Sequence, residues 1–361
     1  ALVIAVSVTV GIGVMIDSFR QTVVRWLESS LRADLYVSAP SRGGGFSGAA
    51  LDPEVARRAA ALPGVEGVHL LRRVELPSDS GPLRMIVLGT DGPGLESFEL
   101  KEGDPEEAWP AFQRGEAVMV SEPFSRRRGV GVGSVLRLPT GQGERDFPVA
   151  GIYYDYASDQ GLVLIARSAY LRLWNDPTLS GLSLDLAPGA DADRVIRELR
   201  AAAGTGPGLA IASNRDLKRV SLVIFDRTFL ITGVLRMLAG LVAFIGVLAS
   251  LTALQLERAR EMGVLRANGM TPGQVWQLIT TQTGLMGLAA GLLSIPVGLA
   301  LAAIMIYVIN QRSFGWSMAM EVSPLILVQA LLLALAAALL AGLYPAWKLA
   351  RTSPALALRE E

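Results

Sequence analysis

The stretch LERAREMGVLRANGMTPGQV, residues 256–275, is the key to the fold because it places a short charged helix between two strongly apolar segments. Residues 237–256 carry no charged side chain, and no charge occurs between residues 267 and 311. Each apolar segment is long enough to enter a lipid bilayer, which needs about 20 apolar residues for one crossing. The pattern therefore predicts a chain that leaves the membrane, forms a short helix and enters the membrane again.

The turn inside this stretch is specified by its own residues. Asn268-Gly269 predicts a helix end, since glycine readily adopts the left-handed conformation required just past the last helical turn. Thr271 has the position of an N-cap, Pro272 suits the first helical position, and Gln274 completes the spacing of a capping box. We expect a sharp, well-defined turn between two helices.

Composition limits the class of protein. The 361-residue chain is 51% hydrophobic with a mean hydropathy of +0.41, which is too apolar for an ordinary soluble protein. Its formal net charge is zero, so no binding to nucleic acid is expected. Cysteine is absent and His69 is the single histidine, which excludes thiolate chemistry and multi-histidine centres. The glycine-rich residues 129–134 lack a P-loop lysine. We expect no catalytic residue, metal site or cofactor in this chain.

Four uncharged windows predict four membrane spans. A charge at the middle of a span costs about 2.5–3.5 kcal/mol on insertion scales, so uncharged windows of this length are not expected by chance in a chain with 18% charged residues. The first window has a rival interpretation as a signal peptide, but it lacks a basic leading region and an A-x-A-type cleavage site. We interpret it as a span whose start precedes this sequence. The windows are residues 1–16, 237–256, 284–309 and 322–347.

Basic residues predict the orientation, because short cytoplasmic segments carry an excess of lysine and arginine. The segment 257–274 and the C-terminal tail are basic, whereas residues 310–323 contain only Arg312. We therefore expect a protein of the plasma (inner) membrane whose large hydrophilic region lies outside the cytoplasm. The residues that carry this argument are Arg258, Arg260 and Arg266 in the first segment and Lys348, Arg351 and Arg359 in the tail.

The predicted fold is an α-helical membrane protein with four transmembrane helices and a large extracytoplasmic α/β domain. Strand and helix patterns at the two ends of the hydrophilic region form one split α/β lobe, and strand-like segments between them form an inserted, mostly β lobe. The expected parts are residues 1–34 as first span and stalk, 35–225 as extracytoplasmic domain with the inserted lobe at about 93–176, and 226–361 as a three-helix transmembrane domain with a cytoplasmic tail.

Two segments join the domain to the membrane. Residues 19–31 and 217–229 both have apolar side chains at helical spacing, directly beside the first and second predicted spans. We expect them to continue out of the bilayer as a pair of stalks. The alternative is two helices that lie on the membrane surface.

At this point the chain resembles a known family. Residues 256–298, beginning LERAREMGVLRANGMTPGQV, are similar to a segment of FtsX-like permeases, the MacB type of ABC transporter, and YPAWKLARTSPALALREE (344–361) is similar to the ending of that family. VSEPFSRRRGVGVGSVLRLP (120–139) followed by FPVAGIYYDY (147–156) resembles its periplasmic core domain. The start of the chain resembles the second half of long permeases with two such units. Many members have glutamate near Gln282, where this chain departs from the pattern.

The resemblance implies a role for the charged helix. In the family it is the coupling helix, here residues 257–269, which docks on a cytoplasmic ATP-hydrolysing subunit. Its arginine and glutamate side chains would supply polar contacts, and its apolar side chains, Val264 among them, would form a packing face. The alternative is a hairpin that lies in the membrane interface with snorkelling arginines. The implied docking residues are Arg258, Arg260, Glu261, Met262, Gly263, Leu265, Arg266 and Gly269.

The resemblance also implies partners and a function. A cytoplasmic ABC ATPase dimer would supply the hydrolysis that this non-enzymatic chain lacks, and a second permease unit, membrane lipid and a periplasmic partner or substrate protein are the other expected contacts. The size of the outer domain favours export or extraction of a lipid, lipoprotein or hydrophobic compound by mechanotransmission. The alternative is an FtsX-type protein that switches an extracellular partner such as a cell-wall hydrolase.

Small residues in the third span predict close helix packing. Gly284, Gly287 and Gly291 have the spacing that lets two helices approach in lipid. Packing inside one subunit and packing between subunits are equally compatible with this spacing. Pro296 predicts a kink in the same span.

Overall fold

The computed structural model describes residues 2–40, 46, 50–78, 81–89, 98–202, 208–257 and 259–351. The chain divides into two compact units. The helical unit comprises Ala1–Gln21, Phe225–Asn310 and Ser317–Glu361, and the sheet unit comprises Thr22–Ile224 and Gln311–Trp316.

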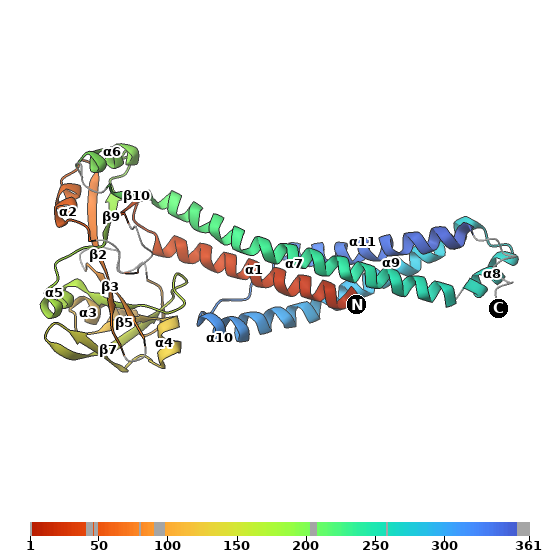
Figure 1. Cartoon of the computed structure of the whole chain (residues 1–361), viewed down its shortest axis with the longest axis horizontal. Helices are drawn as coiled ribbons and strands as arrows, with labels where there is room; N and C mark the ends of the chain where they lie inside the picture. The colour runs from red at the N-terminus through yellow and green to blue at the C-terminus, as the bar shows by residue number, and fades with distance from the viewer. Residues whose placement is uncertain are drawn as a thin grey trace. The chain divides into compact units, whose positions relative to one another are not determined.

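The sheet unit is built on one mixed sheet (Figure 1). Its ten described strands follow the order β10-β1-β9-β2-β3-β8-β5-β7-β4, with β6 paired to β7. Most pairs are antiparallel, but β3 runs parallel to β8 and β5 runs parallel to β7. The strands are β1 Leu35–Ser38, β2 Val65–Leu76, β3 Leu83–Leu88, β4 Leu100–Glu102, β5 Val118–Ser121, β6 Val135–Thr140, β7 Gly143–Tyr153, β8 Val163–Ala166, β9 Gly181–Leu186 and β10 Ala210–Ser213.

Five described helices accompany the sheet. Local signals start two of them, because Asp52 and Asp104 each accept a hydrogen bond from the backbone two residues on and each precedes a proline at the first helical position. The sequence predicts the first and last of the five, whereas the other three lie in the insertion expected to be mostly β. The helices are α2 Pro53–Ala60, α3 Pro105–Gln113, α4 Glu122–Arg128, α5 Arg167–Trp174 and α6 Ala192–Ala202.

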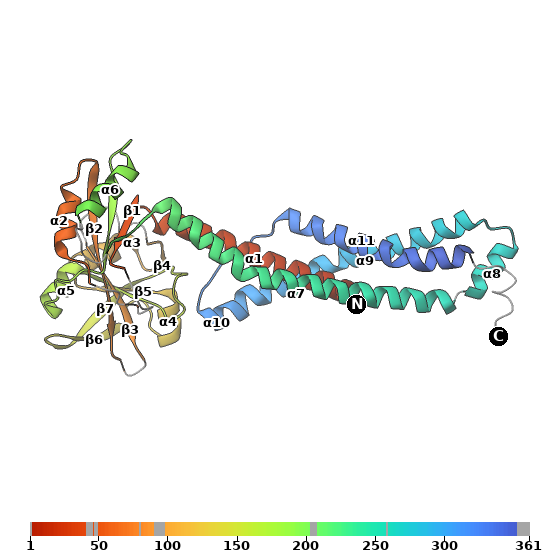
Figure 2. The ribbon, with the colours of Figure 1, turned by 45° about the horizontal axis from the view of Figure 1, so that its top comes forward.

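Three hydrophobic clusters of described residues lie along this sheet, and two of them share a strand. The first contains residues of β1, β9, α2 and α6, and Figure 2 shows these two helices next to each other. The second contains residues of β3, β5, β7 and β8. Val68 and Leu70 of β2 pack against the first core, while Val74 and Leu76 pack against the second. The predicted insertion begins at about residue 93. Strand β3 precedes residue 93, but it packs with the strands of the insertion. Both lobes therefore belong to one sheet.

The helical unit consists of long apolar helices. Two of them, α1 and α7, are continuous with the sheet unit, since each helix contains residues of both units. A π-helical segment follows α9, and the short α10 belongs to the sheet unit. The elements are α1 Leu2–Ser30, α7 Asn214–Glu257, α8 Ala259–Ala267, α9 Pro272–Ile304, η2 Met305–Asn310, α10 Gln311–Phe314 and α11 Pro324–Arg351.

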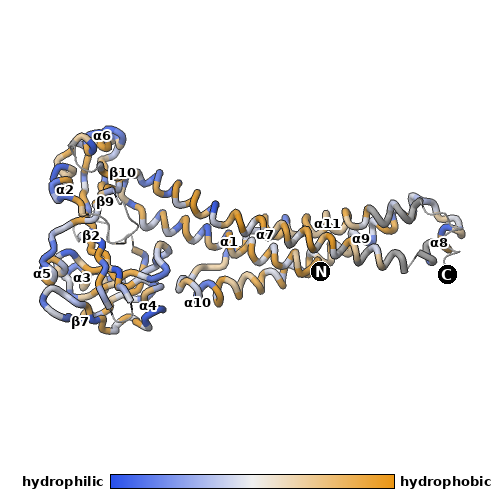
Figure 3. The backbone as a smooth tube through the Cα atoms, viewed as in Figure 1, coloured by the Kyte–Doolittle hydropathy of each residue, from blue (hydrophilic) through white to orange (hydrophobic). Residues whose placement is uncertain are grey.

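Three stretches of the described residues are helical, long and apolar enough to cross a membrane: Leu2–Ser30, Pro272–Phe314 and Pro324–Leu343. The second predicted span, residues 237–256, lies within α7 and is not among these three. Several of its side chains fall outside the described part of the chain. The structure therefore supports three candidate spans, and a count of four stays a prediction. Figure 3 shows the apolar character along α9 and α11.

Small side chains fill the inside of the helical unit. Val10 of α1, Ala302 of α9 and Ala334 of α11 are fully buried in one cluster. Ser7 adds a buried hydrogen bond from its hydroxyl to the carbonyl oxygen of Ser294, 3.2 Å away. Large apolar side chains such as Leu285 and Leu332 are about 60% exposed. This arrangement is typical of helices that pack in lipid, where small residues permit close approach.

Candidate functional site

The short helix α8 ends in a Schellman motif. Gly269 has a φ of +100°, the left-handed conformation that the sequence predicts. Its N–H donates to the carbonyl oxygen of Arg266 at 3.1 Å, and the N–H of Met270 donates to that of Leu265 at 3.2 Å. These two bonds satisfy carbonyls that a helix end otherwise leaves free, so the end of α8 is fixed by the backbone itself.

Helix α9 begins at Pro272 with a complete capping box, whose N-cap is Thr271. The Thr271 hydroxyl accepts from the backbone N–H of Gln274 at 3.3 Å, and the Gln274 side chain accepts from the N–H of Thr271 at 2.9 Å. Met270 packs against the buried Val275, which adds the hydrophobic staple that fixes the direction of entry into a helix. The turn between α8 and α9 therefore has a defined geometry, as the sequence predicts.

The described side chains of α8 leave an apolar pair on the surface. Val264 is 46% exposed and Leu265 is 40% exposed, and Glu261 beside them is exposed as well. Arg266 is half-buried. An exposed apolar pair beside charged side chains is compatible with the apolar centre and polar rim of a protein interface. Of the other predicted docking residues, Arg258 lies outside the described part of the chain. The structure describes the backbone of Arg260, Met262 and Gly263 as helical, but not the burial of these residues.

The predicted glycines of the third span face α11 of the same chain. A Cβ atom at Gly287 would lie 2.6 Å from Cβ of Ala338, and one at Gly291 would lie 2.7 Å from Cδ1 of Leu331. At Gly284 the nearest atom would be 3.6 Å away, which is ordinary contact. The structure thus uses two of the three glycines for close packing of α9 on α11 inside the chain.

The segments expected as stalks lie side by side. In the helical unit, the rings of Phe19 and Phe225 are 5.2 Å apart, and Arg20 forms an ion pair with Asp226 at 3.3 Å. In the sheet unit, the Asn214 side chain donates to the carbonyl oxygen of Leu31 at 2.6 Å. The predicted pairing of the two segments is therefore confirmed, and their place outside the membrane stays a prediction.

Comparison with known proteins assigns both halves of the chain to families. Residues 233–354 match the FtsX-like permease C-terminal family. Residues 1–202, more than half of the chain, match the MacB-like periplasmic core domain. The chain belongs to the FtsX-like and MacB-like permeases of ABC transporters. The permease is the membrane component of such a transporter, and the match to a periplasmic core domain together with the apolar helices indicates a membrane protein with an extracytoplasmic domain.

Curated relatives of the permease are longer than this chain. An uncharacterised ABC transporter permease protein of Mycobacterium tuberculosis is 40% identical over 365 residues, which is 100% of this chain and 43% of that protein. An uncharacterised ABC transporter permease of Methanocaldococcus jannaschii is 22% identical over 65% of this chain and 59% of that protein. The chain therefore spans about half the length of the curated relatives it matches.

Two solved structures are also similar to parts of the permease. The periplasmic region of MacB from Actinobacillus actinomycetemcomitans is 12% identical, with a TM-score of 0.38, over 54% of this chain and 94% of that one. The extracellular domain of the noncanonic ABC-type transporter YknZ from Gram-positive bacteria is 11% identical, with a TM-score of 0.36, over 50% of this chain and 100% of that one.

Sequence reasoning missed an aromatic cluster in the sheet unit of the permease. The indole N–H of Trp316 donates to the carbonyl oxygen of Ser158 at 3.3 Å, and its ring lies 5.9 Å from that of Tyr156. Tyr156 in turn contacts Trp26 near the end of α1, with ring centroids 6.0 Å apart. The segment after α10 thus packs on the sheet unit. Aromatic residues at 314 and 316, in the short segment predicted to be an outer loop, are the signal that could have indicated it.

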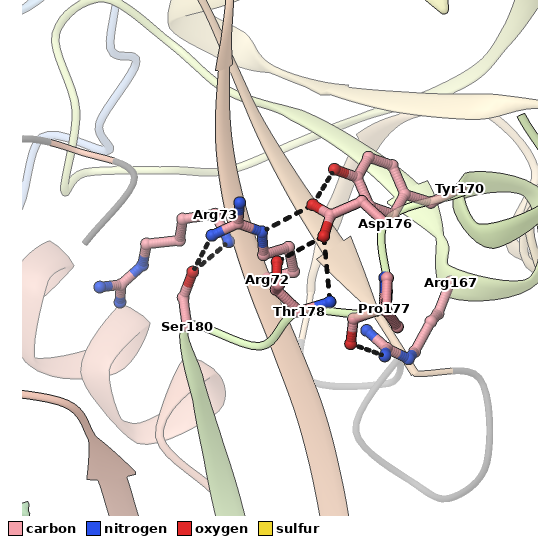
Figure 4. A network of polar contacts seen from close by, with 8 residues as sticks. All are labelled: Arg72, Arg73, Arg167, Tyr170, Asp176, Pro177, Thr178 and Ser180. Atoms are coloured by element: carbon pink, nitrogen blue, oxygen red, sulfur yellow. Dashed lines mark hydrogen bonds and ion pairs between the residues drawn. The ribbon is translucent and has the colours of Figure 1, made fainter. Parts of the chain in front are cut away.

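A polar network joins the two lobes of the sheet unit (Figure 4). Asp176 accepts hydrogen bonds from the Thr178 and Tyr170 hydroxyls and pairs with Arg72 at 3.2 Å. Burial acts to raise the pKa of Asp176, but these hydrogen bonds and the arginine charge outweigh it and lower the pKa to about 2. Burial and the neighbouring carboxylate raise the pKa of Tyr170 to about 12. The network therefore holds a charged carboxylate where the chain passes from one lobe to the other.

Proposed function

We propose that the chain couples ATP hydrolysis by a partner ATPase dimer in the cytoplasm to movement of its extracytoplasmic sheet unit. The observation that carries the proposal is the doubly fixed turn between α8 and α9, with the Schellman motif at Gly269 and the capping box at Thr271. A turn fixed on both sides transmits displacement of one helix to the next, whereas a flexible turn would absorb it. Movement would serve export or extraction of a lipid, lipoprotein or hydrophobic compound.

The docking element is α8. Its exposed Val264 and Leu265 supply an apolar contact, and Glu261 with the neighbouring arginines supplies polar contacts around it. A buried apolar centre with a polar rim is the usual anatomy of a protein interface. The ATPase would therefore hold α8 and, through the fixed turn, displace α9.

Two features support transmission to the sheet unit. Both α1 and α7 are continuous helices that contain residues of each unit, so displacement in the helical unit has an unbroken path. Close packing of α9 on α11, with a glycine at 287, makes that pair move together. The chain would work in the inner membrane with a second permease unit, which agrees with its covering 43% of the longer Mycobacterium tuberculosis relative.

The test substitutes the glycine of the turn. Gly269→Val forces a β-branched residue into a positive φ and should cost about 1–3 kcal/mol of local strain, so the turn loosens. We expect the chain to co-purify with its ATPase in nanodiscs while stimulation of ATP hydrolysis by substrate is lost. Gly273→Val is the matched control, since Gly273 has no positive φ and a Cβ added there would meet no other atom within 4 Å.

Equal ATPase stimulation in the wild type, Gly269→Val and Gly273→Val proteins would contradict the proposal. The turn would then be an ordinary interfacial hairpin, and an FtsX-type switching role without tight coupling would become the better account.

A further inference from the structure

Two successive arginines of β2 point to opposite faces of the sheet. Arg72 lies on the face of Leu70 and Val74, where it pairs with Asp176, and strand geometry directs Arg73 to the other face. Figure 4 shows the Arg73 side chain leading away from the Asp176 network. One arginine therefore has a carboxylate partner, and its neighbour faces a different environment.

Arg73 faces a pocket of about 510 Å³ within the sheet unit. The pocket lies on the sheet face away from α2 and α6, and its size falls within the roughly 300–1,000 Å³ of small-molecule sites. Its lining is mostly apolar, with Leu31 from the end of α1 and Leu217 from α7 above the strands. Tyr36 and Ser183, which are paired neighbours on β1 and β9, also line it.

The guanidinium of Arg73 is the charged group of this pocket. Arg73 is exposed, and among the described residues its guanidinium makes no ion pair. The protein atoms around it nevertheless lower its pKa by displacing part of the water. The nearby carboxylates are engaged elsewhere, since Asp185 lies 2.7 Å from Nε2 of His69 and Asp34 accepts the backbone N–H of Leu186 at 2.8 Å. Burial raises the pKa of the Tyr36 hydroxyl to about 12, so it stays neutral at physiological pH. The pocket therefore combines apolar walls with one uncompensated positive charge.

We infer that this pocket binds a single-chain anionic amphiphile, with the anionic headgroup on Arg73 and the alkyl chain between Leu31, Leu217 and the strands. Charge complementarity selects the headgroup, because an arginine without a carboxylate partner binds a carboxylate or phosphate by charge-assisted hydrogen bonds. The apolar walls favour binding of the alkyl chain of the amphiphile. Binding in this pocket is inferred from the residues that line it. That the bound amphiphile is the substrate of the transporter rests on the proposed function.

The test is photolabelling of the full chain in nanodiscs without any ATPase. The probe is a 12-carbon fatty acid with a diazirine at the end of its chain, and labelled peptides are identified by mass spectrometry. We expect labels on the peptides that contain Leu31 and Leu217. Probes of the same length with a trimethylammonium or an alcohol headgroup should label these peptides at least about tenfold less, the scale of one lost charge-assisted hydrogen bond. Excess inorganic phosphate should not displace the probe. Displacement by phosphate would show that the headgroup site alone provides the affinity, and it would contradict the role of the probe's alkyl chain.

Variants separate the headgroup from the apolar walls. Arg73→Gln should reduce pocket labelling by about tenfold or more, while Arg73→Lys keeps the charge and should retain most of it. Ser183→Trp fills the apolar space without touching the charge and should also abolish labelling. Arg84→Gln removes an arginine of the neighbouring strand β3 that already pairs with Glu75, so it serves as the matched control.

Equal labelling of wild type and Arg73→Gln, or labels confined to the membrane helices, would overturn the inference. Unchanged hydrogen exchange in the sheet strands would show that each variant is folded. Because no ATPase is present, loss of ATPase coupling in the Gly269→Val experiment and loss of labelling here are independent results.

Discussion

The two units bury opposite kinds of side chain. In the sheet unit the inside is made of large residues, such as Phe112, Phe124 and Tyr153, which are at most 2% exposed. In the helical unit the inside is made mainly of alanine, glycine and valine, and large residues such as Leu292 and Leu293 are 53% and 60% exposed. Leucine therefore takes opposite positions within one chain, since Leu138 and Leu164 of the sheet unit are fully buried.

This contrast reflects the solvent that each unit meets. Water drives large apolar groups inward, so the sheet unit gains stability from the area it buries. Lipid tails are as apolar as leucine, so the helical unit gains little from burying large residues and relies on close contact between small ones. Each half of the comparison can be tested by a substitution that should matter in one solvent and not in the other.

The largest effect should come from the core of the sheet unit. Phe124→Ala removes a fully buried ring and should lower the free energy of unfolding by about 3–5 kcal/mol, because a cavity remains. Val135→Ala, at a position 63% exposed, should change it by no more than about 0.5 kcal/mol. Hydrogen exchange of β5 and β8 in the full chain measures both. A similar loss for both variants would show that this unit does not have a water-excluding core.

The next effect concerns the outer surface of the helical unit. Leu293 lies at the middle of the apolar stretch Pro272–Phe314 and points outward, so Leu293→Asp should cost about 2.5–3.5 kcal/mol of insertion free energy. The inserted fraction in microsomes measures this cost. Val135→Asp in the sheet unit is the control and should leave insertion unchanged. If Leu293→Asp inserts as well as wild type, this surface does not face lipid.

A smaller effect should depend on pH. The pKa of Asp176 in the folded chain is about 2, below its ordinary 3.8, so its contribution is full above about pH 4 and is lost as the pH falls toward 2. The stability difference between wild type and Asp176→Asn should be about 2 kcal/mol at pH 5 and shrink toward pH 2. Denaturant unfolding at several pH values measures it, and a difference that does not change with pH would exclude the charged carboxylate, with its hydrogen bonds and its ion pair, as the source.

Much of the fold follows from local sequence. Asp52-Pro53 predicts the start of α2, and residues 268–274 predict both ends of the turn between α8 and α9, because caps depend on neighbours a few residues away. The strands at both ends of the sheet unit follow from period-two patterns. These features need no information about distant parts of the chain.

The features that the sequence missed depend on distant contacts. Parallel pairing of β3 with β8 joins residues 85–88 to residues 163–166, and no local pattern specifies that register. The opposite roles of Arg72 and Arg73 depend on which face of the sheet each one lies on and on the distant residues that it meets there. Packing of Trp316 on Ser158 likewise joins segments 158 residues apart. Docking on α8 stays a prediction from the sequence, supported by its exposed apolar pair.

The most direct measurement of the central claim is a photo-crosslink from α8. Benzoylphenylalanine at Leu265 places the reactive group on the exposed apolar pair, and the same residue at Val135 in the sheet unit is the control. We predict that Leu265 crosslinks to an ABC ATPase identified by mass spectrometry, and that Val135 does not. Crosslinks from Leu265 only to lipid or to the chain itself, or equal ATPase crosslinks from both positions, would contradict the account.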